Sequence, residues 1–173
     1  AVCAVFGTPG SGRSSVAANL AVLAAKRRHR VLLIDLDLEN PSQRLDFGLP
    51  AETAGVSAAL RLLGQRRLDP ERLYKIAPPI TGTRERLRIL TGVMHPDELV
   101  RVNAQAIEGL LEFAANNFDR VFVDTTALRL LGSVSETPDH IEAITRMSTS
   151  AILVADPSPV GAQRLIAAAK LLQ

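Results

Sequence analysis

A glycine-rich turn near the N-terminus constrains this chain more than any other feature. Residues 1–6 form an apolar run, Gly7 and Gly12 enclose four residues, and a helix-like run begins at Ser14. A strand that breaks into such a loop and re-enters as a helix directs several backbone N–H groups and a helix N-terminus at one point, where a phosphate group is stabilised. The order of these segments therefore predicts a phosphate-binding loop.

The loop departs from the general phosphate-binding pattern at one position. The pattern G-x-x-x-x-G-K-[S/T] is matched by Gly7, Gly12 and Ser14, but Arg13 stands where the pattern has lysine. Arginine keeps the positive charge, yet its planar guanidinium needs different space around a phosphate than a compact ammonium does.

The composition is typical of a single domain with a buried core. Of the 173 residues, 47% are hydrophobic, and 20 basic residues nearly balance 18 acidic ones. The net charge therefore gives no direct signal for nucleic acid or an anionic membrane as a partner. Cys3 is the single cysteine, no apolar run reaches the roughly 18 residues of a membrane span, and no signal segment is visible. We expect a cytoplasmic protein without a transmembrane segment.

Five apolar runs alternate with helix-like patterns. The runs are continuous rather than alternating, which indicates strands buried on both faces. We predict an α/β fold, a mostly parallel β-sheet flanked by helices on both faces. The chain begins in a strand-like run and closes in a helix-like one, so we expect one domain, residues 1–173, truncated at both ends. The expected strands are residues 1–6, 30–36, 87–91, 120–124 and 151–155, and the expected helices are residues 14–28, 56–65, 104–116, 138–147 and 160–172.

Local signals refine these elements. Asn103 and Thr137 are expected N-caps, and Pro138 is expected at the first helical position. Residues 69–85 contain three prolines and a glycine and are expected to form an irregular, mobile connection. The basic residues 26–30 could indicate nucleic-acid binding, but they fall at the end of the first helix, where cations complement the helix dipole.

Acidic residues close two of the expected strands. Asp35 and Asp37 end the second strand at a spacing that directs both side chains to the same side, and Asp124 ends the strand of residues 120–124. Nucleotide hydrolysis needs a phosphate cradle, a hydroxyl and a carboxylate around magnesium, and a group that orients water. Ser14 and Asp124 are the candidates for the metal site, and either Asp35 or Asp37 could orient water.

Two other functions remain open at this stage. Asp35 also lies about twenty residues beyond the glycines, the place of a ribose-binding acid in dinucleotide-dependent oxidoreductases. The glycines do not fit G-x-G-x-x-G, however, and that fold gives no reason for Ser14, Asp37 and Asp124 together. A scaffold of the same fold that binds no nucleotide is the second alternative, because the loop lacks its lysine.

The order of these motifs resembles the MinD/ParA family of P-loop ATPases over nearly the whole chain. The residues that carry the likeness are 7–21, 33–37, 118–125 and 152–157. The resemblance implies ATP and Mg²⁺ as cofactors, with Asp124 holding the metal together with Ser14, and Asp37 orienting water. It also implies nucleotide contacts from Gly10, Ser11, Gly12, Arg13, Ser14 and Ser15, with Pro157 near the base.

The sequence also departs from that family. Its members carry a signature lysine early in the loop that reaches the phosphates of a dimer partner, and this chain has Thr8 there, followed by Pro9. Both loop lysines are thus replaced, and a missing cation near the transferred phosphoryl group slows hydrolysis by orders of magnitude. We expect nucleotide binding with weak or absent hydrolysis.

A shorter likeness narrows the resemblance. Residues 87–92 and 96–99 look like the CpaE/TadZ branch, whose members accompany Flp/Tad pilus assembly. Chromosome and plasmid partitioning ATPases share the same motifs and are the alternative. In either case the resemblance implies an ATP-dependent homodimer, protein partners in the pilus or partitioning machinery, and a polar location or one peripheral to the inner membrane.

Overall fold

The computed structural model describes residues 1–93, 96–128 and 138–172. Its strands are β1 (Val2–Gly7), β2 (Val31–Leu36), β3 (Leu87–Leu90), β4 (Arg120–Thr125) and β5 (Ser150–Val154). Its helices are α1 (Arg13–Lys26), α2 (Gln43–Asp46), α3 (Val56–Gly64), α4 (Pro70–Ile76), α5 (Ala104–Asn117), α6 (Asp139–Met147) and α7 (Pro159–Leu171), together with a 3₁₀ helix η1 (Pro96–Arg101).

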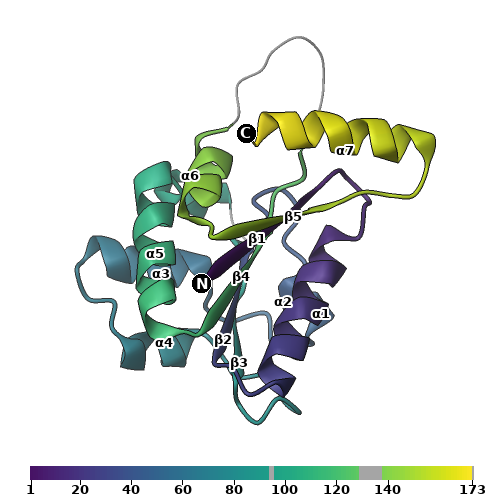
Figure 1. The fold of residues 1–173 in the computed structure, drawn as a ribbon. Coiled ribbons are helices and arrows are strands. Elements are labelled where there is room, and N and C mark those ends of the chain that lie inside the picture. Colours follow the sequence, from purple (N-terminus) through teal and green to yellow (C-terminus); the bar gives the residue numbers. More distant parts are fainter. Residues whose placement is uncertain (94–95, 129–137, 173) are drawn as a thin grey trace.

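The strands form one five-stranded sheet in the order β3-β2-β4-β1-β5, and every neighbouring pair is parallel. Figure 1 shows α1 and α2 on one side of the sheet and α3, α4, α5 and α6 on the other. The carboxyl ends of parallel strands meet at one edge, and a crevice opens there where the strand order reverses. In this order β1 and β2 both flank β4, so the loops after these three strands are neighbours.

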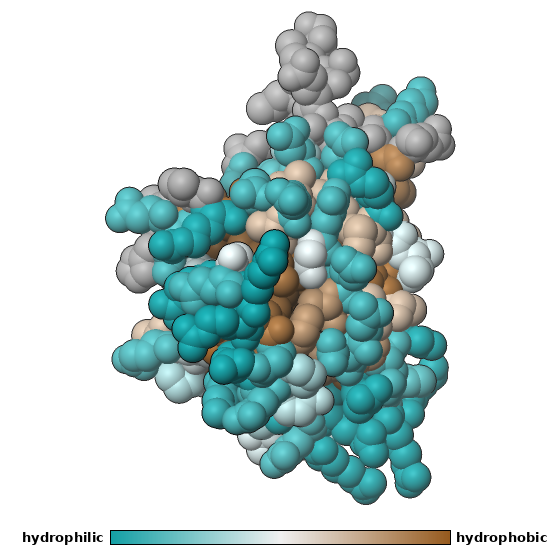
Figure 2. Space-filling model, turned by 90° about the vertical axis from the view of Figure 1, so that its left-hand side faces the viewer, coloured by the Kyte–Doolittle hydropathy of each residue, from teal (hydrophilic) through white to brown (hydrophobic). Residues whose placement is uncertain are grey.

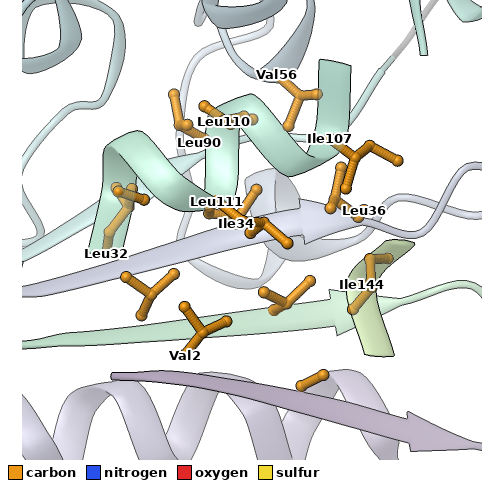
Figure 3. Close-up of a cluster of buried hydrophobic side chains, with 14 of the residues drawn as sticks. Val2, Leu32, Ile34, Leu36, Val56, Leu90, Ile107, Leu110, Leu111 and Ile144 are labelled. Atoms are coloured by element: carbon orange, nitrogen blue, oxygen red, sulfur yellow. The ribbon is translucent and has the colours of Figure 1, made fainter. Parts of the chain in front are cut away.

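Each central strand buries both of its faces, as the continuous apolar runs indicate. On one face Val31, Leu33 and Ile89 pack with the small residues of α1, Ala17, Ala21 and Ala25. On the other face the alternate side chains pack against α3, α5 and α6, and Figure 3 shows this cluster around Ile34 and Leu36. The α/β prediction, with a parallel sheet covered on both faces, is confirmed.

The edge strand β5 differs from the others. Its residues are exposed or half-buried, whereas β2 is buried throughout. The α7 helix that follows leaves Val160 and Ile166 more than half exposed. Among the described residues, no helix combines the length and the apolarity needed to cross a membrane.

Two local predictions need correction. The expected irregular connection at residues 69–85 contains helix α4, in which the Asp69 side chain accepts a hydrogen bond from the Arg72 N–H (2.8 Å) and Pro70 takes the first position. Residues 77–85 are not helical. Pro138 stands at the N-cap position of α6 rather than inside the helix; Thr137 lies outside the described residues. Asn103 is confirmed as the N-cap of α5, because its Oδ1 accepts from the Ala106 N–H (2.9 Å).

The basic residues 26–30 lie at the end of α1, as the helix-dipole interpretation requires. Lys26 occupies the last turn, and Arg30 forms an exposed ion pair with Asp119 (3.0 Å).

Figure 2 looks onto the face that carries α3 and α5, where apolar side chains line a hollow among polar ones. A pocket of about 740 Å³ lies here, lined in part by Leu60, Leu63 and Gly109.

Candidate functional site

The turn between β1 and α1 has the backbone of a cradle. Gly10 and Gly12 adopt φ angles of 76° and 84°, a left-handed region that side chains with a Cβ rarely enter. The Ser11 N–H donates to the Thr8 carbonyl (3.1 Å), which closes a tight turn, and α1 begins at Arg13. The first N–H groups of α1 and the loop amides therefore lie at the carboxyl edge of the sheet, where they can bind an anion.

Gly7 is needed for a different reason, which is close packing. A Cβ at this position would lie 2.5 Å from the Ser11 Oγ and 2.6 Å from the Val154 carbonyl oxygen. The end of β1 is thus pressed between the loop and β5. The spacing of the two outer glycines follows from these two requirements.

Several polar atoms in and beside the loop are buried without a partner in the described chain. They are the Oγ1 of Thr8, the Oγ of Ser11 and the Oε1 of Gln43. A buried polar atom that makes no hydrogen bond costs free energy unless a ligand or water satisfies it. Three such atoms beside one glycine-rich loop fit a site that receives a polar ligand such as a phosphate group.

Asp37 and Asp124 lie at the carboxyl ends of the adjacent strands β2 and β4 and meet at Arg13. The Arg13 Nε donates to the Asp124 Oδ1 (3.1 Å), and its Nη2 forms a short ion pair with the Asp37 Oδ2. The three side chains are nearly buried, with exposed fractions of 8%, 4% and 0% for Arg13, Asp37 and Asp124. The structure therefore brings three of the expected site residues together.

Gln43, at the start of α2, completes this network, and the sequence analysis did not identify it. Its Nε2 donates to the Asp124 Oδ2 (2.7 Å) and to the Ser14 carbonyl oxygen (3.1 Å). It is fully buried. A glutamine six residues beyond Asp37 carries no recognisable signal, because its partners are distant in sequence and only the strand order brings them close.

Asp35 stabilises the backbone of the segment that follows β2 and does not face a ligand. Its two oxygens accept hydrogen bonds from the backbone N–H groups of Asp37 (3.2 Å) and Gln43 (3.0 Å), and it has no exposed surface. Burial, reinforced by the nearby charge of Asp124, raises the pKa of Asp35 to about 7. A ribose-binding acid must reach its ligand, so this enclosure argues against the dinucleotide alternative. Of the two acids after β2, Asp37 is the one in contact with the site.

The pKa of Asp124 is also raised, because burial penalises its charged form. Hydrogen bonds from Gln43, Ser14 and Arg13 and the charge of Arg13 oppose that rise. Among the described residues, no group of three or more His, Cys, Asp or Glu side chains is arranged to hold a metal ion. A magnesium ion that uses one carboxylate, one hydroxyl and substrate phosphates needs no such group.

The remaining expected site residues are placed as follows. Ser14 and Ser15 lie in the first turn of α1, with Ser14 half-buried and Ser15 exposed. Pro157 is exposed in the turn between β5 and α7. This turn lies at the same sheet edge, because β5 pairs with β1 up to Val154 and Gly7.

Thr126, just beyond β4, ties the segment after β2 to the sheet. The Leu38 N–H donates to its Oγ1 (3.0 Å), which in turn donates to the Leu36 carbonyl (3.2 Å). The loops that carry Asp37 and Asp124 are therefore mechanically connected.

Comparison with known proteins shows which family the chain belongs to. The model of the CobQ/CobB/MinD/ParA nucleotide binding domain matches residues 2–169. The chain belongs to this family. The family predicted from the motifs of the sequence is thereby confirmed at this level.

Individual proteins similar to this chain include a curated protein and solved structures. The tyrosine-protein kinase YwqD of Bacillus subtilis (strain 168) is 29% identical over 135 residues, which are 74% of this chain and 53% of that protein. A ParA family ATPase from Chlorobium tepidum TLS is 21% identical, with a TM-score of 0.76 over 98% of this chain and 67% of that one. The septum site-determining protein MinD of Pyrococcus horikoshii OT3, complexed with Mg-ADP, is 19% identical, with a TM-score of 0.75 over 99% of this chain and 63% of that one.

These structural matches establish the shared fold. The chain spans about half the length of the curated relative that it matches.

Proposed function

We propose that this chain binds ATP with Mg²⁺ at the β1–α1 loop and hydrolyses it slowly or not at all. The convergence of Asp37 and Asp124 on the first residue of α1 is the observation that carries the proposal. Backbone amides from Gly10 to Ser15 would bind the phosphates, and Ser14 and Asp124 would hold the metal. Asp37 would orient the attacking water, and Pro157 would lie near the base.

The residues present fit such a ligand. The unpartnered hydroxyls of Thr8 and Ser11 are buried in the loop, and the left-handed glycines leave space above it, since nothing lies within 4 Å of a Cβ built on Gly10 or Gly12. Magnesium, when bound, neutralises phosphate charge and withdraws electrons from the transferred group. The protein's own part is to position the carboxylates, which Gln43 and Thr126 already do.

Replacement of the two loop lysines should lower the rate of hydrolysis. Charge that develops on the transferred phosphoryl group must be met by cations fixed in advance. Arg13 presents a planar guanidinium instead of the compact ammonium of lysine, and Thr8 brings no charge to the loop. Binding relies mainly on backbone amides and is less affected.

A second candidate is phosphoryl transfer to a tyrosine hydroxyl, favoured by the 29% identity to a tyrosine-protein kinase. The same cradle and the same metal site would serve either acceptor, because the donor half of the reaction is shared. The two functions differ in product. Inorganic phosphate indicates hydrolysis, whereas phosphotyrosine on an added tyrosine-containing polypeptide indicates transfer.

The cellular role is a finer part of the proposal. A role in positioning a cell-envelope machine such as the Flp/Tad pilus rests on residues 87–92 and 96–99 alone, and a partitioning role is supported by the similarity of fold to a ParA family ATPase. An ATP-dependent homodimer and a polar or membrane-peripheral location belong to the same proposal. Light scattering with and without ATP tests the dimer.

Calorimetric titration with ATP, ADP and NAD, each with Mg²⁺ and with a chelator, tests the main proposal. We expect saturable, magnesium-dependent binding of ATP and ADP, and none of NAD. Ser14→Ala and Asp124→Asn should weaken the magnesium-dependent part at least tenfold. Arg120→Gln, an exposed position at the opposite end of β4, is the matched control and should bind as the wild type does. Unchanged ATP affinity in both site variants would refute the proposal, and no binding of any nucleotide would favour the scaffold alternative.

A further inference from the structure

The Arg13 side chain lies between the two carboxylates of the candidate site. Its guanidinium bridges the carboxylates of Asp124 and Asp37, which come from two adjacent strands. Within the described chain, both ion pairs of these two carboxylates are with Arg13. A buried carboxylate that stays charged is stabilised by a positive partner, and for Asp37 and Asp124 a side chain provides it.

We propose that Arg13 is the resting counter-cation of the site, and that Mg²⁺ arriving with a nucleotide competes with it for Asp124 and so releases Asp37 as well. This inference rests on the proposed function, because the same carboxylates serve both. Its consequence is a switch of the arginine between two partners. Arg13 pairs with carboxylates before nucleotide binds, and its released guanidinium is then free to approach the phosphates.

The hydrogen bonds show why Arg13 is the group that must move. The Asp124 Oδ1 accepts a hydrogen bond from Arg13, and its Oδ2 accepts one from Gln43 (2.7 Å). The Asp37 Oδ1 accepts from the backbone N–H groups of Glu39 (3.1 Å) and Asn40 (3.0 Å), and its Oδ2 is taken by Arg13. Each oxygen of the two carboxylates therefore already accepts a hydrogen bond, and a cation that binds in place of a donor must displace that donor. The bonds from Arg13 and from Gln43 are both made by side chains and break by rotation alone, but only Arg13 carries a positive charge that a metal ion would repel and replace.

The choice of arginine over lysine follows from the same geometry. Two different nitrogens of one planar group, Nε and Nη2, each reach one carboxylate. An ammonium group has a single nitrogen and does not match two carboxylates as a fixed fork does. Lysine at this position would hold the two carboxylates less firmly.

Metal binding without nucleotide tests the competition directly. We would titrate Mn²⁺, as a paramagnetic substitute for Mg²⁺, into the nucleotide-free protein and measure free Mn²⁺ by electron paramagnetic resonance. Arg13→Met keeps the length of the side chain and removes its charge, and it should bind Mn²⁺ at least tenfold more tightly than the wild type. The double variant Arg13→Met/Asp124→Asn should lose that gain, and Arg120→Gln should match the wild type. Equal Mn²⁺ affinity in Arg13→Met and the wild type would overturn the inference.

A second variant and a second measurement keep the inference testable if Arg13→Met fails to fold. Arg13→Lys should show a smaller gain in the same direction, and circular dichroism confirms the fold of each variant. In the wild type, the Arg13 Nε–H resonance should shift when Mg-ATP is added. If Mg-ATP binds and this resonance stays unchanged, the counter-cation inference is wrong while the proposed function stands. If no nucleotide binds, the proposed function fails, and the Mn²⁺ titration still decides the role of Arg13.

Discussion

Replacing Asp35 by asparagine isolates the cost of burying a carboxylate beneath the site. Burial raises the pKa of Asp35 from its ordinary 3.8 to about 7, which corresponds to about 4 kcal/mol against folding when the group is charged in both states. The folded pKa lies above the unfolded one, so between about pH 4 and 7 the folded state binds more protons. The free energy of unfolding therefore falls as pH rises through this window.

The asparagine of the Asp35→Asn variant does not titrate, so the stability of this variant relative to the wild type should increase with pH. We expect the difference in unfolding free energy, Asp35→Asn minus wild type, to grow by about 3 kcal/mol between about pH 5 and pH 8. The variant also loses one acceptor, because both Asp35 oxygens accept backbone N–H groups. That loss is nearly constant with pH and cancels in the comparison.

Urea unfolding at the two pH values provides the measurement, with linear extrapolation to water. Leu23→Gln, at an exposed position of α1, exchanges one non-titrating side chain for another and is the control, so its difference from the wild type should not depend on pH. A difference for Asp35→Asn that stays constant within about 1 kcal/mol would refute the argument that burial dominates at this position.

Three further substitutions, the first with a matched control variant, test separate contacts. Gly7→Ala would place a Cβ 2.5 Å from a loop hydroxyl and 2.6 Å from a β5 carbonyl, so its affinity for ATP and its melting temperature should both fall. The control Gly64→Ala, whose Cβ would have nothing within 4 Å, should be neutral or stabilise the protein by up to about 1 kcal/mol. Equal effects of the two substitutions on ATP binding and on melting would contradict this. Asn103→Ala removes the cap of α5 (2.9 Å) and should cost about 1 kcal/mol in urea unfolding with ATP affinity unchanged; altered ATP affinity would show coupling that the contacts do not predict. Gln43→Leu removes the hydrogen bond to Asp124 and should accelerate amide hydrogen exchange in residues 37–43, and unchanged exchange would argue against its positioning role.

The sequence predicted the parts of the site that depend on local chemistry. The strand–loop–helix turn and the acids at the ends of β2 and β4 were recognisable because glycine spacing and apolar runs are local patterns. Helix α4 was missed although Asp69 and Pro70 form a start signal, because the prolines at positions 78 and 79 favoured an irregular segment.

The contacts of Arg13 and Gln43 with the carboxylates depend on the order of the strands instead of on local patterns. Asp35 and Asp124 are partners in the register of β2 and β4, and only that pairing brings Arg13 between the two loops. The role of Gln43 depends on the path of the chain after β2 for the same reason. Sequence patterns alone do not encode which loops become neighbours.

A backbone amide NMR titration with Mg-ATP tests the central claim most directly, because it reports where the nucleotide binds. We predict saturable shifts concentrated in residues 7–15, 37–43 and 124–126, with smaller ones in the turn that contains Pro157. Shifts centred on the pocket between α3 and α5, or no saturable shifts at all, would contradict the account.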